Sequence, residues 1–474
     1  MAITERPEGT DLDLTAVDVA GIVEGVRATY NSGRTKSMEW RQRQLDGLLR
    51  MLEVEGGRFE EALHLDLGRP AIEGFATDIG SVATEIAGMR KHASKWAKPR
   101  KVRLPLTSLP GKGSIVPEPL GVALVMAPWN YPINLLLLPV AAAIAAGNAV
   151  IAKPSEIAGA TSSLLAELMP RYVDSEAIAV IEGDAAVATA LLEQRFDHIF
   201  YTGSTEVGRI VYQAAARHLT PCTLELGGKS PVFVDDSADV EVTARRLAWG
   251  KWLNAGQTCV APDYVLVTDK NRDALVDGMR QAFVDFAAGG GTKNNADYGS
   301  IVTDRHARRL SSMLDDHGGT VAFGGDVDID AKYVEPTVIL DPAVDSKIMQ
   351  EEIFGPLLPV LTVESMVEAV RIVNEREKPL ALYIFAEDSD TVDELIGQTT
   401  SGGTCVNQVI QHLLPPELPF GGVGQSGTGR YHGVSGFDTF SNLRSVLKKP
   451  TKPDPKLLYP PYTAMKERLI RRFI

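Results

Sequence analysis

"INLLLLPVAAAIAAGNAVIA", residues 133–152, is the stretch that decides the fold. Its twenty residues carry no charge, which meets the usual length of a membrane span. Pro139 and the Gly147-Asn148 pair interrupt it, and their backbone and side-chain polar groups need partners that lipid does not supply. We therefore interpret the stretch as a buried helix over 140–146, a turn, and a short buried strand over 149–152. A helix followed by a strand in this way is typical of a parallel sheet.

Short apolar runs on both sides of this stretch have the length of strands and alternate with helical stretches. They are "GVALVMA" (121–127), "NAVIAKP" (148–154), "AIAVIEG" (177–183), "HIFYTG" (198–203), "TLELGG" (223–228) and "SPVFVD" (230–235). Strands alternating with helices predict a parallel α/β sheet. After residue 239 the pattern begins again with helices over 240–255 and 271–288. Further strands and helices follow to about 403, so we predict a second α/β unit.

The flanking segments differ from this core. Residues 15–65 and 71–97 place apolar side chains at three- and four-residue spacing, which predicts amphipathic helices. The segment "KVRLPLTSLPGKGSIVPEPLG" (101–121) alternates around "LPGKG", which indicates a β-hairpin or a protruding arm that pairs with a partner chain. The tail "TAMKERLIRRFI" (463–474) carries four basic residues. A docked or frayed terminus and a weakly bound membrane-surface helix both fit it.

Composition narrows the class of protein. The chain has 474 residues, of which 44% are apolar, and a net charge of -13, which argues against a nucleic-acid binder. Its three cysteines, Cys222, Cys259 and Cys405, lie far apart without a CxxC or Cys/His run, so we expect neither zinc nor disulfides. The first residues, "MAITERPEGTDLDLTA", show no signal peptide. We therefore expect a cytoplasmic protein without a transmembrane segment.

Two glycine-rich loops resemble phosphate-binding loops only in part. "HIFYTGSTEVGRIV" (198–211) runs from a strand into a helix, but Gly203 and Gly208 do not make a GxGxxG pattern. "LELGGKS" (224–230) ends like a P-loop but has Thr223 where the first glycine belongs. These departures argue against an NTPase. From the residues alone, a structural turn fits each loop as well as a phosphate site does.

One cysteine stands in an unusual setting. "NAGQTCVAPDYV" (254–265) holds Cys259 between a Gly-Gln turn and an Ala-Pro-Asp turn. A lone cysteine is more often a small buried apolar residue than a nucleophile. The residues of this stretch leave both interpretations open.

Seven segments, taken together, resemble the aldehyde dehydrogenase superfamily in their order and spacing. They are "MAPWNYP" (126–132), "KPSE" (153–156), "YTGSTEVG" (201–208), "LELGGKSP" (224–231), "NAGQTCVAPDYV" (254–265), "QEEIFGP" (350–356) and "LPFGGVGQSG" (418–427). A closer resemblance is to the class 3 branch, which includes fatty-aldehyde and aromatic-aldehyde enzymes. It rests on Tyr131, "GQTCVAPDYV", "KPLALYIFAED" (378–388), "YHGVSGFDTFSNLRSVL" (431–447) and "YPPY" (459–462).

The resemblance implies an α/β fold with three parts. A Rossmann-like parallel-sheet domain that binds NAD(P) takes residues 1–100 and 119–224, and a second α/β domain, the catalytic one, takes 225–403. A small β oligomerisation element combines 101–118 with 404–446, and 447–474 form a C-terminal tail. Class 3 relatives are usually dimers, so we expect a homodimer, with a tetramer as the alternative.

The resemblance also implies the NAD(P)-dependent oxidation of an aldehyde to a carboxylic acid. Cys259 attacks the carbonyl as a thiolate, giving a thiohemiacetal and then a thioester. Asn130 and the backbone N–H of Cys259 stabilise the oxyanion, and Glu225 activates the water that hydrolyses the thioester. No histidine lies near Cys259 in sequence, so we expect loop N–H groups and the nicotinamide ring to lower its pKa. The branch favours medium- or long-chain aliphatic or aromatic aldehydes, and no metal is implied.

The cofactor contacts follow from the same resemblance. Lys153 and Glu156 match the ligands of the adenosine ribose, and a carboxylate there favours NAD, with NADP left as an alternative. Glu352 matches the ligand of the nicotinamide ribose, although a solvated acidic face is its ordinary interpretation. The remaining matches are Gly203, Ser204 and Gly208 at the pyrophosphate, Trp129 and Val207 along the groove, and Phe354 beside the nicotinamide.

Three other functions are alternatives for a chain with these motifs. A CoA-acylating relative passes the acyl group to a thiol, and a reductase of acyl phosphates uses the same cysteine. Neither needs the water-activating carboxylate, so Glu225 argues against both. A non-catalytic binding protein on this fold has no need to keep Cys259, Glu225, Asn130 and Lys153 together.

Overall fold

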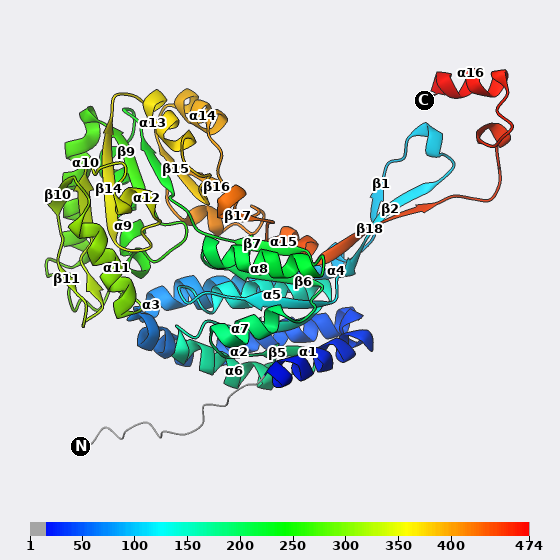
Figure 1. Ribbon diagram of the computed structural model, residues 1–474, viewed down its shortest axis with the longest axis horizontal. Coiled ribbons are helices and arrows are strands. Elements are labelled where there is room, and N and C mark those ends of the chain that lie inside the picture. The colour runs from blue at the N-terminus through cyan, green and yellow to red at the C-terminus, as the bar shows by residue number, and fades with distance from the viewer. Residues whose placement is uncertain (1–15, 474) are drawn as a thin grey trace.

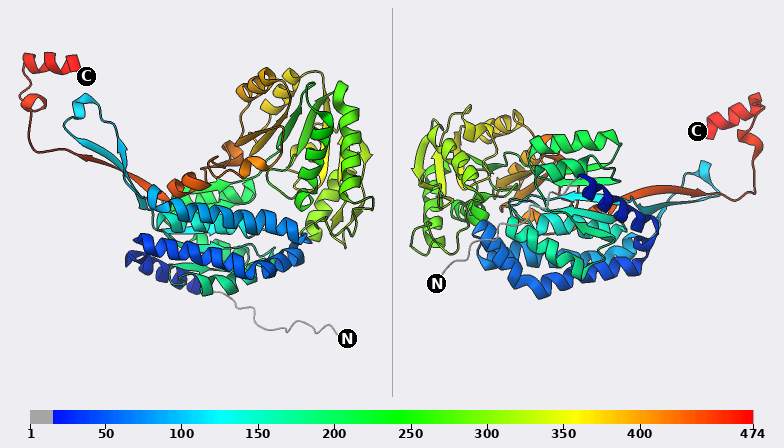
Figure 2. Two further views of the ribbon diagram at one scale, coloured as in Figure 1. Left: turned by 180° about the vertical axis from the view of Figure 1, so that it is seen from behind. Right: turned by 60° about the horizontal axis from the view of Figure 1, so that its bottom comes forward.

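The protein consists of two α/β units and a long arm. The structure, a computed structural model, describes residues 16–473, so residues 1–15 of the stretch in which we expected no signal peptide lie outside the described residues. Figures 1 and 2 show the two units side by side and the arm projecting from one of them. The arm carries the C-terminal helix α16 (Ala464–Phe473) at its far end.

The first unit contains a six-stranded sheet with strand order β17-β7-β6-β3-β4-β5. All neighbouring strands are parallel except the short β17, which pairs antiparallel with β7. The order reverses between β3 and β6, and such a switch point opens a binding crevice at the carboxyl ends of the strands. The strands are β3 (Val122–Met126), β4 (Ala149–Lys153), β5 (Ile178–Val180), β6 (His198–Thr202), β7 (Cys222–Glu225) and β17 (Gly427–Thr428).

The stretch 133–152 forms the centre of this unit. Helix α5 (Asn134–Ala146) is buried from Leu135 to Ala146, which explains its apolar composition on every side. It ends at Gly147, and β4 follows at once, so the predicted helix, turn and strand are confirmed, with the helix starting earlier than expected. Among the described residues, no helix has the length and apolarity needed to cross a membrane.

The other helices of this unit pack around the sheet and α5. The helices predicted over 15–65 and 71–97 are confirmed. The second range begins with a short helix and a five-residue π-helix. This π-helix turns the buried Asp78 toward the start of α5. The helices are α1 (Ala16–Asn31), α2 (Met38–Leu67), α3 (Ala71–Gly74), the π-helix Phe75–Ile79, α4 (Gly80–Trp96), α6 (Gly159–Tyr172), α7 (Ala185–Leu192) and α8 (Thr205–Arg217).

The second unit contains a seven-stranded sheet with strand order β10-β13-β14-β9-β8-β15-β16. The chain enters it between Glu225, at the end of β7, and Pro231, at the start of β8. Only the edge strand β10 is antiparallel, so the predicted second α/β unit is confirmed. The strands are β8 (Pro231–Val234), β9 (Tyr264–Thr268), β10 (Thr320–Phe323), β13 (Thr337–Leu340), β14 (Leu357–Val363), β15 (Ala381–Phe385) and β16 (Gly403–Val406).

Helices and a small hairpin accompany this second sheet. The helices are α9 (Val240–Trp252), α10 (Asp269–Phe286), α11 (Asp304–Asp315), α12 (Lys347–Gln350), α13 (Met366–Asn374) and α14 (Ser389–Gln398). Strands β11 (Val327–Asp328) and β12 (Tyr333–Val334) pair with each other.

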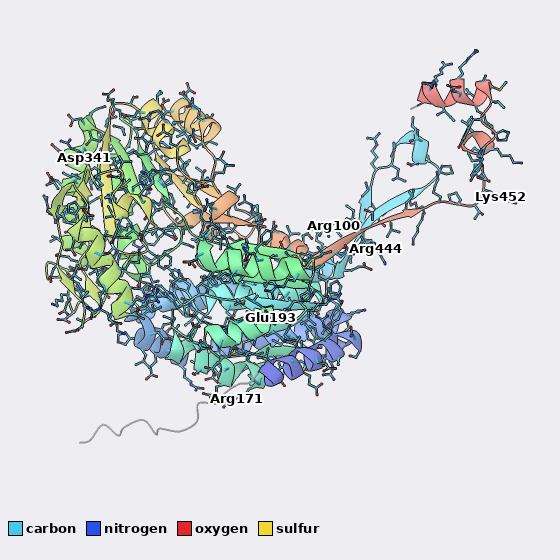
Figure 3. All side chains as sticks on the ribbon, in the orientation of Figure 1. Arg100, Arg171, Glu193, Asp341, Arg444 and Lys452 are labelled. Atoms are coloured by element: carbon cyan, nitrogen blue, oxygen red, sulfur yellow. The ribbon has the colours of Figure 1, made fainter. Side chains whose placement is uncertain are left out.

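The arm is a three-stranded antiparallel sheet of β1 (Arg100–Val102), β2 (Lys112–Pro119) and β18 (Ser441–Lys448). The predicted hairpin is confirmed, but the expectation that 404–446 joins it is wrong for most of that range. Strand β16 pairs in parallel with the buried β15 of the second sheet, and residues up to α15 (Gly433–Thr439) lie in the body. Arg100 and Arg444 lie where the arm leaves the body (Figure 3), and Arg100 pairs there with Asp438.

The end of α5 provides a test of stability. Gly147 has a φ of 98°, and an added Cβ would lie 2.5 Å from the buried Arg41 guanidinium. We expect Gly147→Ala to lower the free energy of unfolding by about 1–3 kcal/mol, because the left-handed backbone and the clash both disfavour a side chain. Gly88→Ala, in α4 with open space around it, is the control and should raise it by up to ~1 kcal/mol. Urea unfolding measures both, and equal stabilities would contradict this account.

Candidate active site

The predicted site residues gather where the two sheets face each other. From the first sheet, Asn130 follows β3, Lys153 ends β4 and Glu225 ends β7. The carboxyl ends of these parallel strands share one edge of the sheet, as the switch-point rule requires. From the second unit, the loop before β9 supplies Cys259, and the loop before β14 supplies Glu352.

The loop that carries Cys259 is held in a strained shape. Asn254 and Ala255 both have a φ of 50°, a left-handed conformation that costs non-glycine residues free energy. The Gln257 side chain fixes the loop: it donates to the Asn254 and Ser300 carbonyls and accepts from the Val302 N–H. Such strain persists only because the surroundings determine the loop's conformation.

Neighbours hold the same loop on both sides of the cysteine. The Tyr131 hydroxyl lies 2.6 Å from the Thr258 hydroxyl, and the Tyr383 hydroxyl donates to the Val260 carbonyl. Both tyrosines are buried. The residues before and after Cys259 are therefore fixed by different units of the fold.

Burial raises the pKa of the Cys259 thiol to about 12. The nearby Glu352 and Glu225 carboxylates contribute to this rise, whereas the backbone N–H groups of Cys259 and Val260 oppose it. The N–H groups thus act in the direction we expected, but burial outweighs them. Without cofactor, the thiol is protonated at neutral pH.

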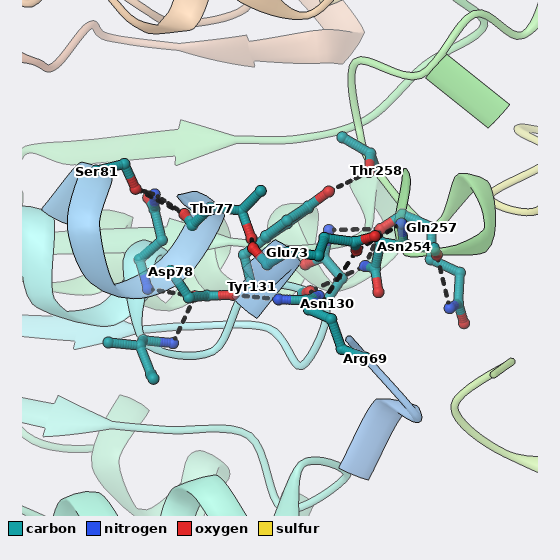
Figure 4. Close-up of polar contacts among 12 residues, drawn as sticks. Arg69, Glu73, Thr77, Asp78, Ser81, Asn130, Tyr131, Asn254, Gln257 and Thr258 are labelled. Carbon is teal, nitrogen blue, oxygen red and sulfur yellow. Dashed lines mark hydrogen bonds and ion pairs between the residues drawn. The ribbon is translucent and has the colours of Figure 1, made fainter. Parts of the chain in front are cut away.

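The Asn130 side chain is buried and turned toward the cysteine loop. Its Nδ2 donates to the Gln257 carbonyl at 3.1 Å, which leaves the second amide hydrogen for another acceptor (Figure 4). Its main-chain carbonyl accepts from Arg69 and, at 3.0 Å, from Asn254 Nδ2. Asn130 is therefore fixed at both its side-chain amide and its main-chain carbonyl, as a preorganised oxyanion donor requires.

The Glu225 carboxylate is buried, and neither oxygen has a hydrogen-bond partner among the residues that the structure describes. Burial raises its pKa well above the usual range, and Arg430 opposes this rise. A carboxylate with a raised pKa is a stronger base once it is ionised. Its free oxygens can accept hydrogen bonds from water, as buried polar atoms usually do.

Glu352 is a second buried carboxyl near the thiol. Burial raises its pKa to about 8, Asp263 adds to the rise, and the Gly228 N–H opposes it. Its Oε1 has no partner within the described part of the chain, so a hydroxyl group has an acceptor there. A solvated acidic face, the ordinary interpretation of this residue, is therefore wrong.

Three side chains that the sequence did not point to make hydrogen bonds with the backbone of the Glu352 loop. Arg309 donates to the Glu352 carbonyl at 3.1 Å, and Lys251 Nζ donates to the Gly355 carbonyl at 3.0 Å. Asp263 accepts from the Ile353 N–H at 3.0 Å. Contacts to main-chain atoms leave no pattern in the sequence, so no signal pointed to these residues.

Aromatic rings close one side of the site. Phe354 has a φ of 48°, and its ring stands edge-on to Trp129 at 5.4 Å between centroids. The predicted neighbours Trp129 and Phe354 thus come from the two different units and contact each other. Each ring offers an apolar face or edge against which a planar ring of a ligand can pack.

The start of helix α8 suits a pyrophosphate. Ser204 caps the helix by accepting from the Val207 N–H at 3.3 Å, and Val207 is 40% exposed. The N–H groups of a first helical turn and the helix dipole favour an anion there. The Thr202 hydroxyl nearby is buried and has no partner in the residues described.

The two predicted glycines also make close contacts within the fold. The Gly203 N–H already donates to the Glu225 carbonyl at 3.0 Å, so it is engaged within the sheet. An added Cβ at Gly208 would lie 2.7 Å from the Leu226 side chain. Gly208 therefore allows α8 to pack closely on the sheet, which is a common role of glycine in such turns.

Lys153 and Glu156, which the sequence predicts to be ribose ligands, lie side by side. Lys153 Nζ lies 3.2 Å from Glu156 Oε2 and also donates to the Pro154 carbonyl. The lysine is buried, whereas the Glu156 side chain is 46% exposed. A cation and a carboxylate side by side can bind the two hydroxyls of a ribose, so these residues fit a dinucleotide.

Comparison with known proteins agrees with this geometry. Residues 4–446 match the model of the aldehyde dehydrogenase family. The chain is 44% identical over 452 residues to the dimeric NADP-preferring aldehyde dehydrogenase of Rattus norvegicus, covering 95% of this chain and 99% of that protein. It is 44% identical to aldehyde dehydrogenase family 3 member A2 of Rattus norvegicus, covering 94% and 92%. The substrate-bound structure of Staphylococcus aureus AldH matches with a TM-score of 0.93 and 41% identity, covering 96% and 99%.

Fold and site together define an NAD(P)-dependent oxidoreductase that oxidises aldehydes. With matches along nearly its whole length, the chain belongs to the aldehyde dehydrogenase family. The family 3 relatives confirm the resemblance to the class 3 branch.

The raised pKa of Cys259 predicts a steep pH dependence of its reactivity. The thiolate is the reactive form, so alkylation of Cys259 by iodoacetamide should rise about tenfold per pH unit below a pKa of about 12. Peptide mass spectrometry follows Cys259 separately from Cys222 and Cys405. Saturating NAD should shift the profile to lower pH, because a positive ring favours the thiolate. A plateau near neutral pH without NAD, or an unchanged profile with it, would contradict this account.

Proposed function

We propose that Cys259 is the nucleophile of the oxidation and that Asn130 stabilises the oxyanion. The observation that carries this proposal is the hydrogen bond from the Asn130 amide to the Gln257 carbonyl, two residues before the cysteine. Attack by the thiolate forms a carbon–sulfur bond and moves the carbonyl electron pair onto oxygen. The free Asn130 amide hydrogen and the Cys259 N–H then donate to this oxygen, and one such donor contributes roughly 2.7–4 kcal/mol.

Glu225 is the base of the second half of the reaction. Its unpartnered oxygens accept a proton from a water molecule, and the resulting hydroxide attacks the thioester carbon. The carbon–sulfur bond breaks, the acid leaves and the Cys259 thiolate is restored. Retention of this carboxyl next to the thiol supports hydrolysis over transfer to CoA or to phosphate.

NAD(P), when bound, would supply the acceptor for the hydride (one proton with two electrons) that this oxidation releases. Lys153 and Glu156 would hold its adenosine ribose, Ser204 and the first turn of α8 would hold its pyrophosphate, and Glu352 would hold its second ribose. The exposed carboxylate of Glu156 favours NAD, and the flexibility of an exposed side chain also leaves room for NADP. The relative named as NADP-preferring supports the second option.

The substrate is a medium- or long-chain aliphatic aldehyde or an aromatic one. The class 3 resemblance supports this choice, as does the burial of the groups around the thiol. A charged substrate would lose its hydration there without a matching partner.

The function test separates the two halves of the reaction. Glu225→Gln should release one equivalent of reduced cofactor from hexanal in a burst and then stall, because the thioester is not hydrolysed. Cys259→Ala should give no burst, while binding NAD as tightly as the parent. Stopped-flow absorbance measures the burst, and mass spectrometry detects the acyl group on Cys259. Steady turnover by Glu225→Gln would remove Glu225 from the role of base.

The protein forms a homodimer through its arm in the cytoplasm. Strand β18 runs along the whole of β2, so the arm is rigid, yet Leu106, Leu443 and Leu447 are exposed on it. Exposed apolar side chains on a projecting ribbon are typical of a surface covered by a partner.

The basic helix α16 lies beyond this ribbon, where a weak contact with an anionic membrane surface remains an alternative to packing on the partner.

The arm provides a test of the dimer. The double substitution Leu443→Glu and Leu447→Glu should give a monomer, because it places charges on the surface that the partner covers. Light scattering after size exclusion measures the mass. Leu65→Glu, on an exposed position of α2, is the matched control and should leave the mass unchanged. A dimeric double variant would exclude this surface from the interface.

A further inference from the structure

Three charged residues from one N-terminal segment lie buried between the two units. Arg69, Glu73 and Asp78 belong to the segment that runs from the end of α2 through the π-helix. The side chains of Arg69 and Asp78 are fully buried, and that of Glu73 is 9% exposed. Figure 4 shows this cluster beside Asn130 and the loop that leads to Cys259. Buried charges of this kind are costly, so their contacts indicate what they do.

Arg69 binds two different partners with the two ends of its guanidinium. One nitrogen pairs with Asp78, and the other donates to the main-chain carbonyl of Asn130. The guanidinium also lies over the Tyr131 ring, 4.6 Å from its centroid. Arg69 thus contacts the residue of the oxyanion donor and the residue after it.

Asp78 holds the chain just after Asn130. Its Oδ1 accepts from the N–H groups of Ile133 at 3.1 Å and Asn134 at 2.8 Å, which are otherwise unsatisfied at the start of α5. The π-helix widens the turn at this point, and such insertions are frequent at functional sites. Arg69 and Asp78 pair with each other. Together they therefore hold the chain by hydrogen bonds at Asn130 and just after it.

Glu73 extends the cluster to the cysteine loop. Its carboxylate accepts from the N–H of Asn254 at 2.8 Å, where the backbone is left-handed. Asn254 Nδ2 in turn donates to the carbonyls of Asn130 at 3.0 Å and Gln257 at 3.1 Å. Burial raises the pKa of the Glu73 carboxyl, and the charge of Arg69, 3.6 Å away, opposes that rise.

We propose that Arg69 is a positioning residue that aims the Asn130 amide at the oxyanion. This inference rests on the proposed role of Asn130. Without the guanidinium, the Asn130 carbonyl keeps Asn254 alone as a partner, and Asp78 and Glu73 lose their counter-charge. The peptide of Asn130 can then rotate, and the amide loses its preorganisation.

Two reagents show whether Arg69 positions the oxyanion donor or only stabilises the site as a whole. Acylation of Cys259 by 4-nitrophenyl acetate expels 4-nitrophenolate and passes through an oxyanion, whereas alkylation by iodoacetamide needs the thiolate only. We expect Arg69→Met to slow acylation about 10- to 100-fold, somewhat less than loss of a donor itself. Alkylation of Cys259 and the dissociation constant of NAD should stay within about twofold. Arg69→Lys should give a smaller loss of acylation, because one ammonium cannot bind both partners as the guanidinium does.

Arg41 provides a matched control. It is another buried arginine that donates to main-chain carbonyls, those of Ala145 and Lys36, and its Nε likewise lacks a partner within the described residues. Arg41→Met should destabilise the protein but leave acylation unchanged. If Arg69→Met does not fold, the comparison of Arg69→Lys with Arg41→Met carries the test.

A double-mutant cycle with Asn130→Ala completes the experiment. Because Arg69 acts through Asn130, the double variant should acylate no more slowly than Asn130→Ala alone. Additive losses, an equal loss of alkylation and acylation in Arg69→Met, or unchanged acylation would each overturn the proposal. Normal acylation by Asn130→Ala would instead remove Asn130 from the oxyanion site, and the inference would fall with it.

Discussion

The hydrogen bond between the Asn130 amide and the Gln257 carbonyl is the contact on which the rest of the site depends. It joins the end of β3 in one unit to the loop before β9 in the other, so neither unit contains the site alone. The buried cluster around Arg69 secures the first end, and the Gln257 side chain secures the second. Relative movement of the two units would separate the proposed oxyanion donor from the proposed nucleophile, and the polar contacts at this junction oppose such movement.

Burial sets the chemical character of the site. The thiol of Cys259 and the carboxyls of Glu225 and Glu352 all have raised pKa values for the same reason, because the apolar surroundings disfavour their charged forms. Three groups that would repel one another as anions can lie close together because burial shifts each of them toward its neutral form. A positive charge brought into this space favours ionisation, so a cofactor with a cationic ring changes the protonation of the site as well as the redox chemistry.

The sequence predicted the parallel strands and the second unit, because apolar runs of strand length are local signals. The seven ordered motifs are local signals as well, and they name the residues that we propose for the site. The sequence misplaced β16, since a parallel strand pairs with a distant partner and only the fold shows whether β15 or the arm supplies it. It also missed the π-helix at Phe75–Ile79, whose cause is the contact of Asp78 with N–H groups far along the chain. Lys251 and Arg309 went unnoticed because they bind carbonyl groups, which every residue possesses.

The high pKa of the Cys259 thiol also bears on how long the protein lasts. Peroxides oxidise the thiolate, and the first product can proceed to forms that are not recovered. A protonated thiol is a poor target, so a pKa of about 12 would slow the oxidation of Cys259 in the cofactor-free protein. If cofactor binding creates the thiolate, the same change makes the sulfur reactive toward aldehydes and toward peroxides. The lifetime of the enzyme in an oxidising environment would then depend on how much of it is loaded with cofactor while aldehyde is scarce.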